Sequence, residues 1–462
     1  MPRFLPFRAP ASGPYAYWIV VAMLAVAALA GGASREDSMA QVVVRTLLPL
    51  LLALLALVAR PVEWRSLRLP LLFMGLVVLV AAIMLVPLPP SVWTALAGRD
   101  LIEPAAQVAG MPQPWRPWAM VPPLGHNALY ALVPPGTVLV AMAFLSPGER
   151  ARLAAPLGIV IVASAVLGVA QVSGGSGSPL RWYAITNRGE GVGFFANRNH
   201  QALFLAMGFP VLAFLAFAGE RRKDDLRVWL AGFAALLLAV AVLTTGSRAG
   251  LVAGAIGVLG SAALHFGRLR GAFAGLPPRW RLLSGIGAVA VLALVAVALL
   301  TSSRALAIVR LFGLDPTDDL RARALPTMVA ILRDTFPAGT GFGGFEPVFR
   351  AAEPFELLSL AYLNEAHNDY LQLAIEGGAA GLALLAAFLV WWAVTTFRLL
   401  RRGRRGQLGP STALARTGAL MVLLVVLASA ADYPMRTPLM MVTLVLACVW
   451  MTLPTERTAP ER

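Results

Sequence analysis

Apolar stretches long enough to cross a lipid bilayer recur along almost the whole chain of 462 residues. A spanning helix needs about 20 predominantly apolar residues. Such stretches begin near residues 15, 40, 69, 128, 152, 199, 226, 248, 282, 373, 413 and 437. Because 58% of the residues are hydrophobic and only 13% are charged, a soluble fold could not bury this much apolar surface. The sequence therefore predicts an all-α, polytopic integral membrane protein with about twelve transmembrane helices.

Basic residues indicate which ends of these helices face the cytoplasm. The formal net charge is +15, but the arginines and lysines lie mainly in short loops, where they act as topology signals, and we expect no nucleic-acid partner. One orientation places both termini and all basic clusters in the cytoplasm: Arg3 and Arg8, Arg60 to Arg68, Arg150 and Arg152, Arg221 to Lys223, Arg268 to Arg281, and Arg398 to Arg405. The opposite, extracytoplasmic face then receives residues 89–127, 173–198, 244–248, 302–370 and 431–437.

The largest extracytoplasmic loop, residues 302–370, is too apolar and too regular to be a linker. Its segment from Asp315 to Asp319 has the capping side chains and the proline of a helix start, and Pro337 ends the pattern. In between, apolar residues recur at helical spacing: Leu320, Ala324, Met328, Ile331 and Leu332. We expect a short helix that lies on the membrane surface or over a cavity. The glycine-rich run from Gly339 to Phe345 lacks the lysine of a phosphate loop and is interpreted as a tight turn.

Few residues are suited to thiol or metal chemistry. The single cysteine, Cys448, lies inside an apolar stretch. The four histidines fall in separate segments without metal-ligand spacing: His126, His200, His265 and His367. We therefore expect no metal and no other cofactor.

Two arginine-containing segments on the outer face are suited to binding an anion. Ser247 and Arg248 stand at a predicted helix start, where a hydroxyl, a guanidinium and the helix N-terminus together attract negative charge. Arg321 and Arg323 lie on the predicted loop helix. Arginine suits phosphate because its planar fork donates two parallel hydrogen bonds and stays charged. The alternatives are that Arg248 only extends to the membrane interface and that Arg321 and Arg323 form a solvated face.

The segment from Asn364 to Gln372 crowds ionisable and amide groups at a predicted bilayer boundary, where uncompensated burial is expensive. If the following stretch is helical, Asn368, Gln372 and Glu376 share one stripe, while His367 and Tyr370 lie on the neighbouring face. Histidine suits a general base because its usual pKa lies near neutral pH. The alternative is that His367 is structural and caps the helix start.

Two further outer-face clusters are weaker candidates. Asn197, Arg198 and Asn199 precede His200 at the head of a span and would bind a polar ligand or cap their own helix. The segment from Asp432 to Arg436 joins the last two spans, and a proline turn with an internal ion pair would explain it without any function. We interpret that segment as mainly structural.

These motifs, taken in order, resemble the O-antigen ligase family of bacterial envelope glycosyltransferases. The matching parts are Asn197 to Gln201, Thr245 to Gly250, Leu320-Arg321 with the Gly341-Phe342-Gly343 turn, His367 to Gln372 with Glu376-Gly377-Gly378, and Asp432-Tyr433-Pro434. The resemblance implies a catalytic region over residues 191–440, preceded by an N-terminal transmembrane region of about five helices over residues 1–190. Residues 441–462 then form the end of the last helix and a cytoplasmic tail.

The resemblance also implies the chemistry and the location. The protein would be a multi-pass enzyme of the bacterial inner (cytoplasmic) membrane with its active site facing the periplasm. It would transfer a glycan from an undecaprenyl diphosphate carrier to a hydroxyl acceptor, a sugar of the lipid A core in true ligases, without a metal and with inversion. His367 matches the proposed base, and Arg248 and Arg321 match the arginines that hold the diphosphate. Secondary candidates are Arg323, Asn368, Tyr370, Asn197, Arg198, Asn199 and Ser247.

Other functions remain open at this stage. O-antigen or exopolysaccharide polymerases, which extend a growing polysaccharide, and protein O-oligosaccharyltransferases share the architecture and differ mainly in the acceptor. A lipid or glycan transporter is a different class, and it should contain internal repeats with broken helices in matching places. No convincing repeat is present, and the polar residues gather on one face and not at mid-membrane.

Overall fold

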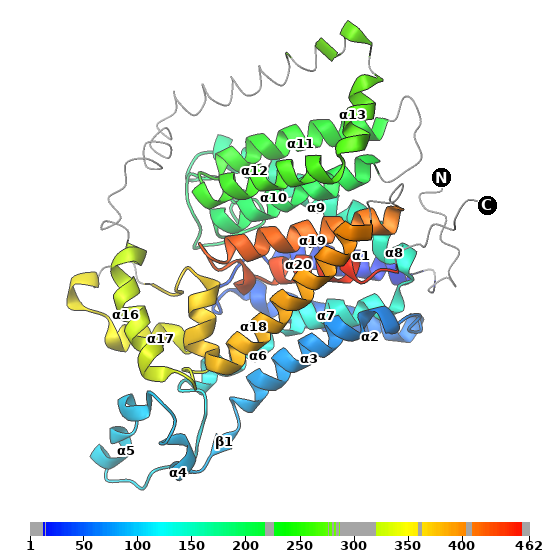
Figure 1. The fold of residues 1–462 in the computed structure, drawn as a ribbon. Helices are drawn as coiled ribbons and strands as arrows, with labels where there is room; N and C mark the ends of the chain where they lie inside the picture. Colours follow the sequence, from blue (N-terminus) through cyan, green and yellow to red (C-terminus); the bar gives the residue numbers. More distant parts are fainter. Residues whose placement is uncertain are drawn as a thin grey trace.

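The computed structural model describes residues 13, 15–217, 226–275, 277–279, 281, 282, 286, 320–358, 363–402 and 409–454. This part of the chain is almost entirely helical (Figure 1), and its one sheet is a two-stranded antiparallel pair of β1 (Pro87–Leu88) and β2 (Arg116–Pro117). The all-α prediction is therefore confirmed.

Eight helical segments of the described residues are long and apolar enough to cross a membrane, and three shorter apolar helices accompany them. The long segments contain α2 (Met39–Val58), α3 (Arg68–Ile83), α6 (Pro122–Ala131) with α7 (Val133–Ala141), α8 (Pro147–Arg152) with α9 (Ala154–Ser173), α10 (Arg198–Phe217), α11 (Leu226–Thr244), α18 (Asp369–Arg402) and α19 (Pro410–Ala428). The shorter ones are α1 (Ala16–Ala30), α12 (Arg248–Leu264) and α20 (Pro438–Met451). Each coincides with a predicted stretch, whereas the stretch expected from residue 282 runs into residues outside the described part.

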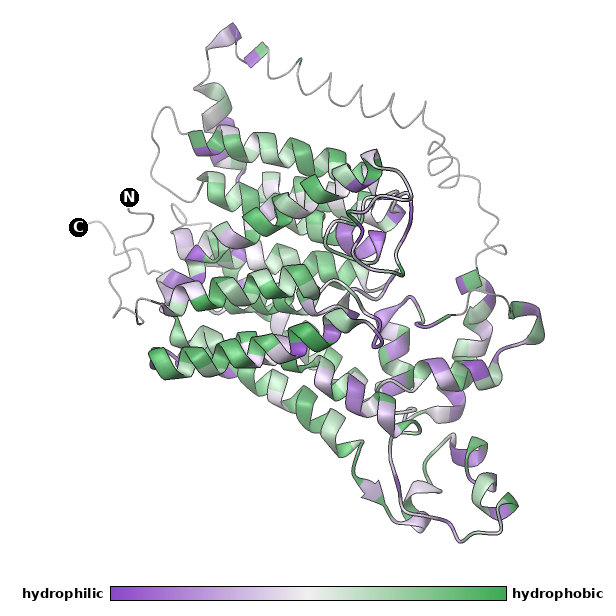
Figure 2. Ribbon diagram, turned by 180° about the vertical axis from the view of Figure 1, so that it is seen from behind, coloured by the Kyte–Doolittle hydropathy of each residue, from purple (hydrophilic) through white to green (hydrophobic). Residues whose placement is uncertain are grey.

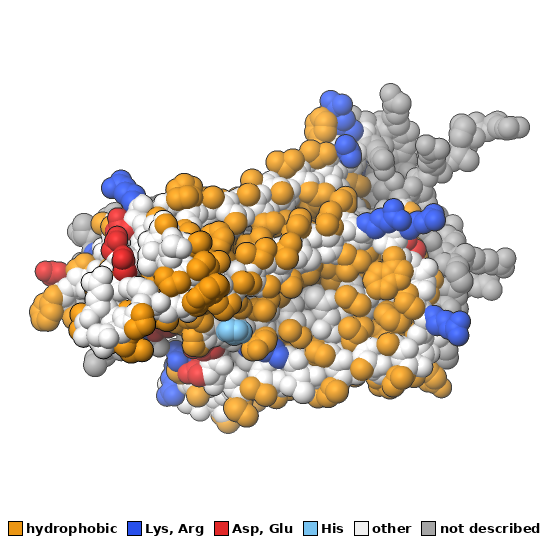
Figure 3. Space-filling view, turned by 90° about the horizontal axis from the view of Figure 1, so that it is seen from below, with side chains coloured by type: hydrophobic (Ala, Val, Ile, Leu, Met, Phe, Trp, Pro, Cys, Tyr) orange, Lys and Arg blue, Asp and Glu red, His pale blue; other side chains and the backbone are white. Residues whose placement is uncertain are grey.

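Burial separates central from peripheral helices. In α10, 83% of the spanning window is buried and in α19 72%, whereas the values are 11% for the span containing α3 and 22% for α2 and α11. A helix that is apolar all round is buried in the centre of a bundle, and apolar side chains on outer helices face lipid. Figure 2 shows that the helices of the bundle are predominantly apolar, and Figure 3 shows apolar side chains over much of the face that it draws.

The segments predicted to be extracytoplasmic gather at one end of the bundle. There Figure 1 shows α4 (Pro90–Trp93), α5 (Pro104–Val108), α16 (Leu320–Thr335) and α17 (Phe345–Ala352), while α8 and α13 (Phe266–Ala274) lie towards the other end. Short 3-10 turns complete the described elements: Arg65–Leu67, Arg99–Leu101, Met142–Phe144, Phe355–Leu357 and Pro434–Arg436.

The predicted loop helix exists as α16, but its apolar stripe does not lie on a membrane surface. Ala324, Met328 and Ile331 are buried in a small second core with Phe345 and Phe349 of α17. The stripe is covered because α17 supplies apolar partners that sequence spacing did not reveal. The predicted helix start from Asp315 to Asp319 lies outside the described residues.

A break in α18 shapes the region next to this core. Gly378 has φ 53° and ψ −144°, which interrupts the helix and frees backbone groups that must find other partners. The glycine-rich turn supplies them: Thr340 N–H donates to Ile375 O (2.9 Å) and Gly341 N–H to Glu376 O (2.9 Å). A Cβ on Gly339 would lie 2.6 Å from Glu376 O, so only glycine permits this approach. The run is a tight turn, as predicted.

Arg99 joins the 84–121 segment to the glycine-rich turn that contains Gly339. It is 1% exposed and donates to the carbonyls of Trp118 (2.6 Å) and Gly339 (3.2 Å). Burial lowers the pKa of Arg99 to about 10. The 84–121 segment is thus tied to the same turn that supports α18.

Candidate active site

His367 and Asp432 form a hydrogen-bonded pair at the end of the bundle that carries α16 and α17. His367 stands just before α18 with φ 51°, a rare conformation for a residue other than glycine. Its Nδ1 lies 3.1 Å from Oδ1 of Asp432, in the connection between α19 and α20. The Asp432 side chain is 3% exposed and that of His367 17%. A strained backbone at a partly exposed histidine is typical of a functional site.

This contact defines the protonation of the imidazole. A carboxylate acceptor favours the proton on Nδ1, which leaves Nε2 as the ring atom able to accept a proton. Among the described residues, no hydrogen-bond partner contacts Nε2. Burial alone would raise the pKa of Asp432, but the hydrogen bond from His367 and the nearby His200 outweigh it and hold that pKa below its usual value. This arrangement is suited to a general base.

The start of α10 supports Asp432 from the opposite side. His200 is 1% exposed, and its Nε2 lies 3.8 Å from Oδ2 of Asp432. Asn197 donates to the hydroxyl of Tyr433 (3.5 Å), the residue that follows Asp432. The Tyr433 ring meets both histidine rings edge to face, at 4.8 Å from His367 and 5.1 Å from His200. Burial, with Asp432 and Glu365 nearby, raises the pKa of Tyr433 to about 12.

A charged cluster around Arg436 joins the connection between α19 and α20 to the segment of residues 365–376. Its Nη2 donates to Glu376 Oε2 (3.0 Å), and its Nε lies 3.9 Å from Asp369 Oδ1 and 4.0 Å from Glu365 Oε2. Gln372 donates to both Glu365 and Glu376. Burial raises the pKa of Glu365 to about 7, although Arg436 opposes this shift. The predicted polar stripe of α18 thus faces protein, with Gln372 and Glu376 each 1% exposed.

The internal ion pair predicted between Asp432 and Arg436 is wrong. The 3-10 turn at Pro434–Arg436 separates the two side chains, so that Asp432 meets His367 and His200 while Arg436 meets the carboxylates of the 365–376 segment. Interpreting this connection as mainly structural overlooked Asp432 and, with it, His200. The signal was present in the sequence, since Asp432 is the only acidic residue in the connection.

The two arginines of α16 point to different places. Arg321 Nη1 donates to the carbonyl of Ala431 (3.4 Å), next to Asp432 in the chain. Arg323 is exposed, and its Nη2 donates to the carbonyl of Glu356 (2.9 Å) in the extramembrane part. The geometry therefore brings Arg321, and not Arg323, beside the His367–Asp432 pair.

Arg248 stands at the first residue of α12, beside the start of α10. The preceding Ser247 is buried and accepts a hydrogen bond from Gly250 N–H (3.0 Å), so its hydroxyl serves as a helix cap. A Cβ on Gly246 would lie 3.8 Å from Nη1 of Arg198, which pairs with Glu190. Arg248 is half-buried, and its guanidinium has no hydrogen-bond or ion-pair partner within the described residues. Asn197, the residue before Arg198, donates to the hydroxyl of Tyr433.

Two secondary candidates have structural partners. Asn368 Oδ1 accepts from Tyr370 N–H and Leu371 N–H (both 3.0 Å), so Asn368 and not His367 caps α18. The Tyr370 hydroxyl donates to Val426 O of α19.

These features define a class: a polytopic membrane protein with a carboxylate-oriented histidine and nearby arginines at one end of the bundle. Comparison with known families names it more closely, because residues 233–386 match the family model Wzy_C, described as O-antigen ligase. The match covers a third of the chain and supports the resemblance of its motifs to the O-antigen ligase family. The match includes Arg248, Arg321 and His367 and ends before Asp432. None of the curated proteins compared with the chain matches it.

This match supports an enzyme of the ligase and polymerase group that acts on lipid-linked glycans in a membrane setting.

Proposed function

We propose that the protein is a ligase that transfers a glycan from undecaprenyl diphosphate to a hydroxyl of the lipid A core at the periplasmic face of the inner membrane. The observation that carries this proposal is the His367–Asp432 pair, in which Nδ1 is engaged and Nε2 has no partner among the described residues. An unprotonated Nε2 on a partly exposed ring is the atom needed to accept the proton of an acceptor hydroxyl.

The proposed reaction is a single displacement. As the acceptor oxygen bonds to the anomeric carbon, its proton passes to Nε2 of His367. The bond between the anomeric carbon and the diphosphate oxygen breaks, and its electron pair leaves with the lipid diphosphate. Arg248 and Arg321 stabilise the charge on that leaving group, and the anomeric configuration is inverted. Fixed guanidinium groups thus take the part that a metal plays in other glycosyl transfers, and we propose a metal-independent enzyme.

The test is transfer by the purified full chain in lipid nanodiscs, with and without lipid A core, in buffer containing EDTA. We expect glycan on the lipid A core with the wild type, and we expect His367→Ala to reduce kcat by at least about 100-fold because the general base is lost. His126→Ala is the matched control, since His126 lies on α6 and bonds to Pro122 O.

Other products would assign other activities. Longer lipid-linked chains formed without lipid A core would make the protein a polymerase. Full transfer by His367→Ala would contradict the proposed base. Absence of any product with verified donor and acceptor would favour protein glycosylation or transport.

A further inference from the structure

The connection between α9 and α10 carries an exposed pair of stacked aromatic rings. The indole of Trp182 lies nearly parallel to the ring of Phe194, with an interplanar angle of 8° and 5.5 Å between the ring centroids. Phe194 is 9% exposed and supports one face of the indole, whereas Trp182 is 47% exposed. A flat ring that is held at the surface offers a ligand a large contact area. We name this pair the Trp182 platform.

Buried polar side chains fix the backbone around both rings. Gln171, which is fully buried near the end of α9, donates to Leu180 O (3.1 Å) and Gly193 O (3.0 Å). The hydroxyl of Tyr183 accepts from Gly32 N–H (3.0 Å), just after α1. Because these contacts already hold the loop in place, the protein loses little conformational freedom when a ligand binds to the platform.

Charged and amide side chains accompany the platform. Arg181, the residue before Trp182, donates to Asn187 O (3.1 Å) and Glu190 O (2.8 Å), which holds this part of the loop near the indole. The carboxylate of Glu190 pairs with Arg198, and their side chains are 26% and 38% exposed. A sugar ring has a C–H face that packs on an aromatic ring and hydroxyls that bond to polar groups. The combination therefore suits a carbohydrate.

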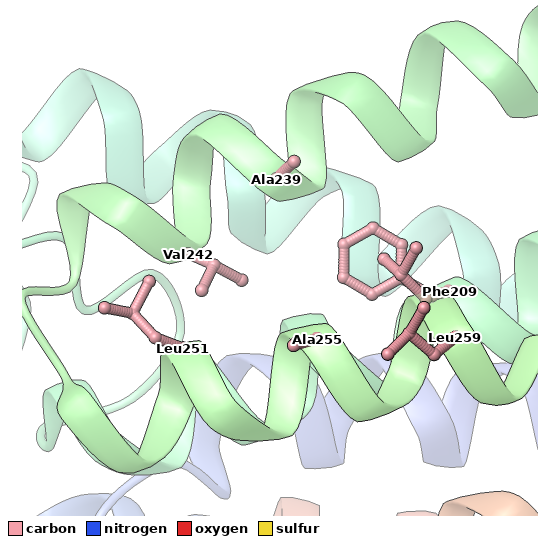
Figure 4. A pocket seen from close by; sticks show the side chains of 8 residues that line it. Phe209, Ala239, Val242, Leu251, Ala255 and Leu259 are labelled. Carbon is pink, nitrogen blue, oxygen red and sulfur yellow. The ribbon is translucent and has the colours of Figure 1, made fainter. Parts of the chain in front are cut away.

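The apolar hollow between α10, α11 and α12 lacks this combination (Figure 4). All eight lining residues are apolar, among them Phe209, Val242 and Leu251, so their side chains offer a glycan no hydrogen bond. Sugar hydroxyls that leave water without finding a new partner cost free energy. The Trp182 platform is therefore the better candidate for binding a glycan.

Ring contacts lead from the platform to the candidate base. Phe195, which follows Phe194, meets the ring of His200 edge to face, with 6.3 Å between centroids. The ring of Tyr433 lies 5.1 Å from that of His200 and 4.8 Å from that of His367. The platform also lies just before α10, whose spanning window is 83% buried. Its place beside a central helix favours a ligand of the site over anchoring at the membrane interface, where exposed tryptophans also occur.

We propose that the Trp182 platform binds a sugar of the substrate glycan at a distance from the sugar that reacts. This inference rests on the proposed function, because glycan chains are the substrates there. Since several rings separate Trp182 from His367, the platform does not hold the reacting sugar itself. The same chemistry belongs to the glycan of the donor and to the core oligosaccharide of the acceptor, and the experiments distinguish these two sources.

The first test removes the indole. With the full chain in nanodiscs, Trp182→Ala is expected to raise KM about tenfold for the substrate whose glycan the platform binds. We expect little change in kcat, because a remote sugar is bound equally before and during reaction. Trp182→Phe should restore most of the affinity, since it keeps an aromatic face. Trp115→Ala removes another exposed tryptophan, in the 84–121 segment, and is the matched control.

The substrate whose KM changes identifies the source of the glycan. A higher KM for the donor that disappears when its glycan is shortened to one sugar would assign the platform to the donor. A higher KM for the lipid A core would assign it to the acceptor. Unchanged KM for both substrates would overturn the proposal.

The second test does not depend on activity. Hydroxyl-radical footprinting with mass spectrometry measures the accessibility of Trp182 in nanodiscs. The probes are two lipid-free oligosaccharides, one released from the donor and one from the lipid A core. We expect Trp182 to be oxidised without oligosaccharide and protected by one of the two, with Trp115 unchanged. Protection that is already complete without oligosaccharide would indicate a membrane anchor, and it would refute the platform, as would the absence of protection by either probe.

The two tests separate this inference from the proposed function. Protection of Trp182 by an oligosaccharide without glycan transfer would support the platform and contradict the ligase. Transfer with unchanged KM in Trp182→Ala and without protection would support the ligase and overturn the platform.

Discussion

At the scale of single residues, the candidate site contains a buried carboxylate, Asp432, that bonds to a histidine, His367. Asp432 accepts a hydrogen bond from His367 Nδ1 and is approached by His200, and its surroundings hold its pKa below the usual value. In the proposed mechanism Asp432 acts through the imidazole of His367 and is a positioning residue. Its effect should be on turnover and not on binding.

Asp432→Asn tests this role. An amide can donate to Nδ1 and so favour the wrong tautomer, and we expect kcat to fall by about 100-fold or more with KM nearly unchanged. Asp432→Glu should restore part of the rate because it returns the acceptor. Steady-state kinetics measures kcat and KM of both variants. Asp100→Asn, in the 84–121 segment, is the control. A loss confined to KM would argue against the role.

Arg321 and Arg323 offer a matched comparison on one helix. Because Arg321 reaches Ala431 O next to Asp432 and Arg323 reaches Glu356 O, only Arg321→Ala should weaken leaving-group stabilisation. We expect about a 100-fold lower kcat for Arg321→Ala and a change below about threefold for Arg323→Ala. The assignment of Arg321 fails if the two variants show the opposite order in the nanodisc assay.

Glu365 makes stability depend on pH. Three carboxylates share Arg436, and burial raises the pKa of Glu365 to about 7. The folded protein then binds a proton that the unfolded chain, with its lower pKa, has already released. The free energy of unfolding should therefore decrease as pH rises from about 4.5 to about 7.

Glu365→Gln should remove this slope. Thermal unfolding in detergent at a series of pH values measures it, and Glu346→Gln on the surface of α17 serves as the control. Parallel curves for the wild type and Glu365→Gln would contradict the prediction.

At the scale of elements, the break in α18 bonds to the segment that follows α16 and so joins α16 and α17 to the bundle. Pro337 O accepts from Ala379 N–H (3.0 Å), just after the left-handed Gly378. A Cβ on Gly378 would lie 2.2 Å from Pro337 O, which no rotation of a side chain can relieve. The site segment 363–377 depends on this junction for its position.

Gly378→Ala should therefore lower the free energy of unfolding by about 2 kcal/mol or more. Gly232→Ala, in the open middle of α11, should be neutral or slightly stabilising because alanine favours helices. Chemical unfolding in detergent compares the two. An equal effect of both substitutions would show that the break does not require glycine.

The periodic apolar pattern was a good guide to elements and a poor guide to their partners. The ranges of α16 and of most spanning helices follow from spacing and length. Spacing does not encode contacts between distant segments. It therefore did not predict that α16 packs against α17 or that the glycine-rich turn bonds to the break in α18.

At the scale of the whole molecule, the bundle is polarised, with α16, α17 and the 84–121 segment at one end and α8 and α13 towards the other. We expect the first end to face the periplasm because the basic loops gather on the opposite side.

One arginine of those loops has a further role: Arg150 is fully buried and donates to Ser66 Oγ (2.7 Å) and Met142 O (2.8 Å).

Labelling can test this orientation. In a Cys448→Ala background, single cysteines replace Met111 and Arg323 at one end, and Arg60 and Arg268 at the other. A membrane-impermeant thiol reagent added to right-side-out vesicles should label only the first two. Labelling of the Arg60 and Arg268 positions alone would reverse the proposed topology.

The sequence by itself determined the membrane class, the helical architecture, the resemblance to a ligase family and the candidate residues His367, Arg248 and Arg321, because span length, charge distribution and local motifs are properties of contiguous residues. It did not determine that Asp432 contacts His367, that His200 lies on the other side of Asp432 or that Arg436 bonds to α18. Those features join segments up to 232 residues apart. Only the packing of α10, α18, α19 and α20 brings them together, since a buried charge is stable only where a distant segment supplies its partner.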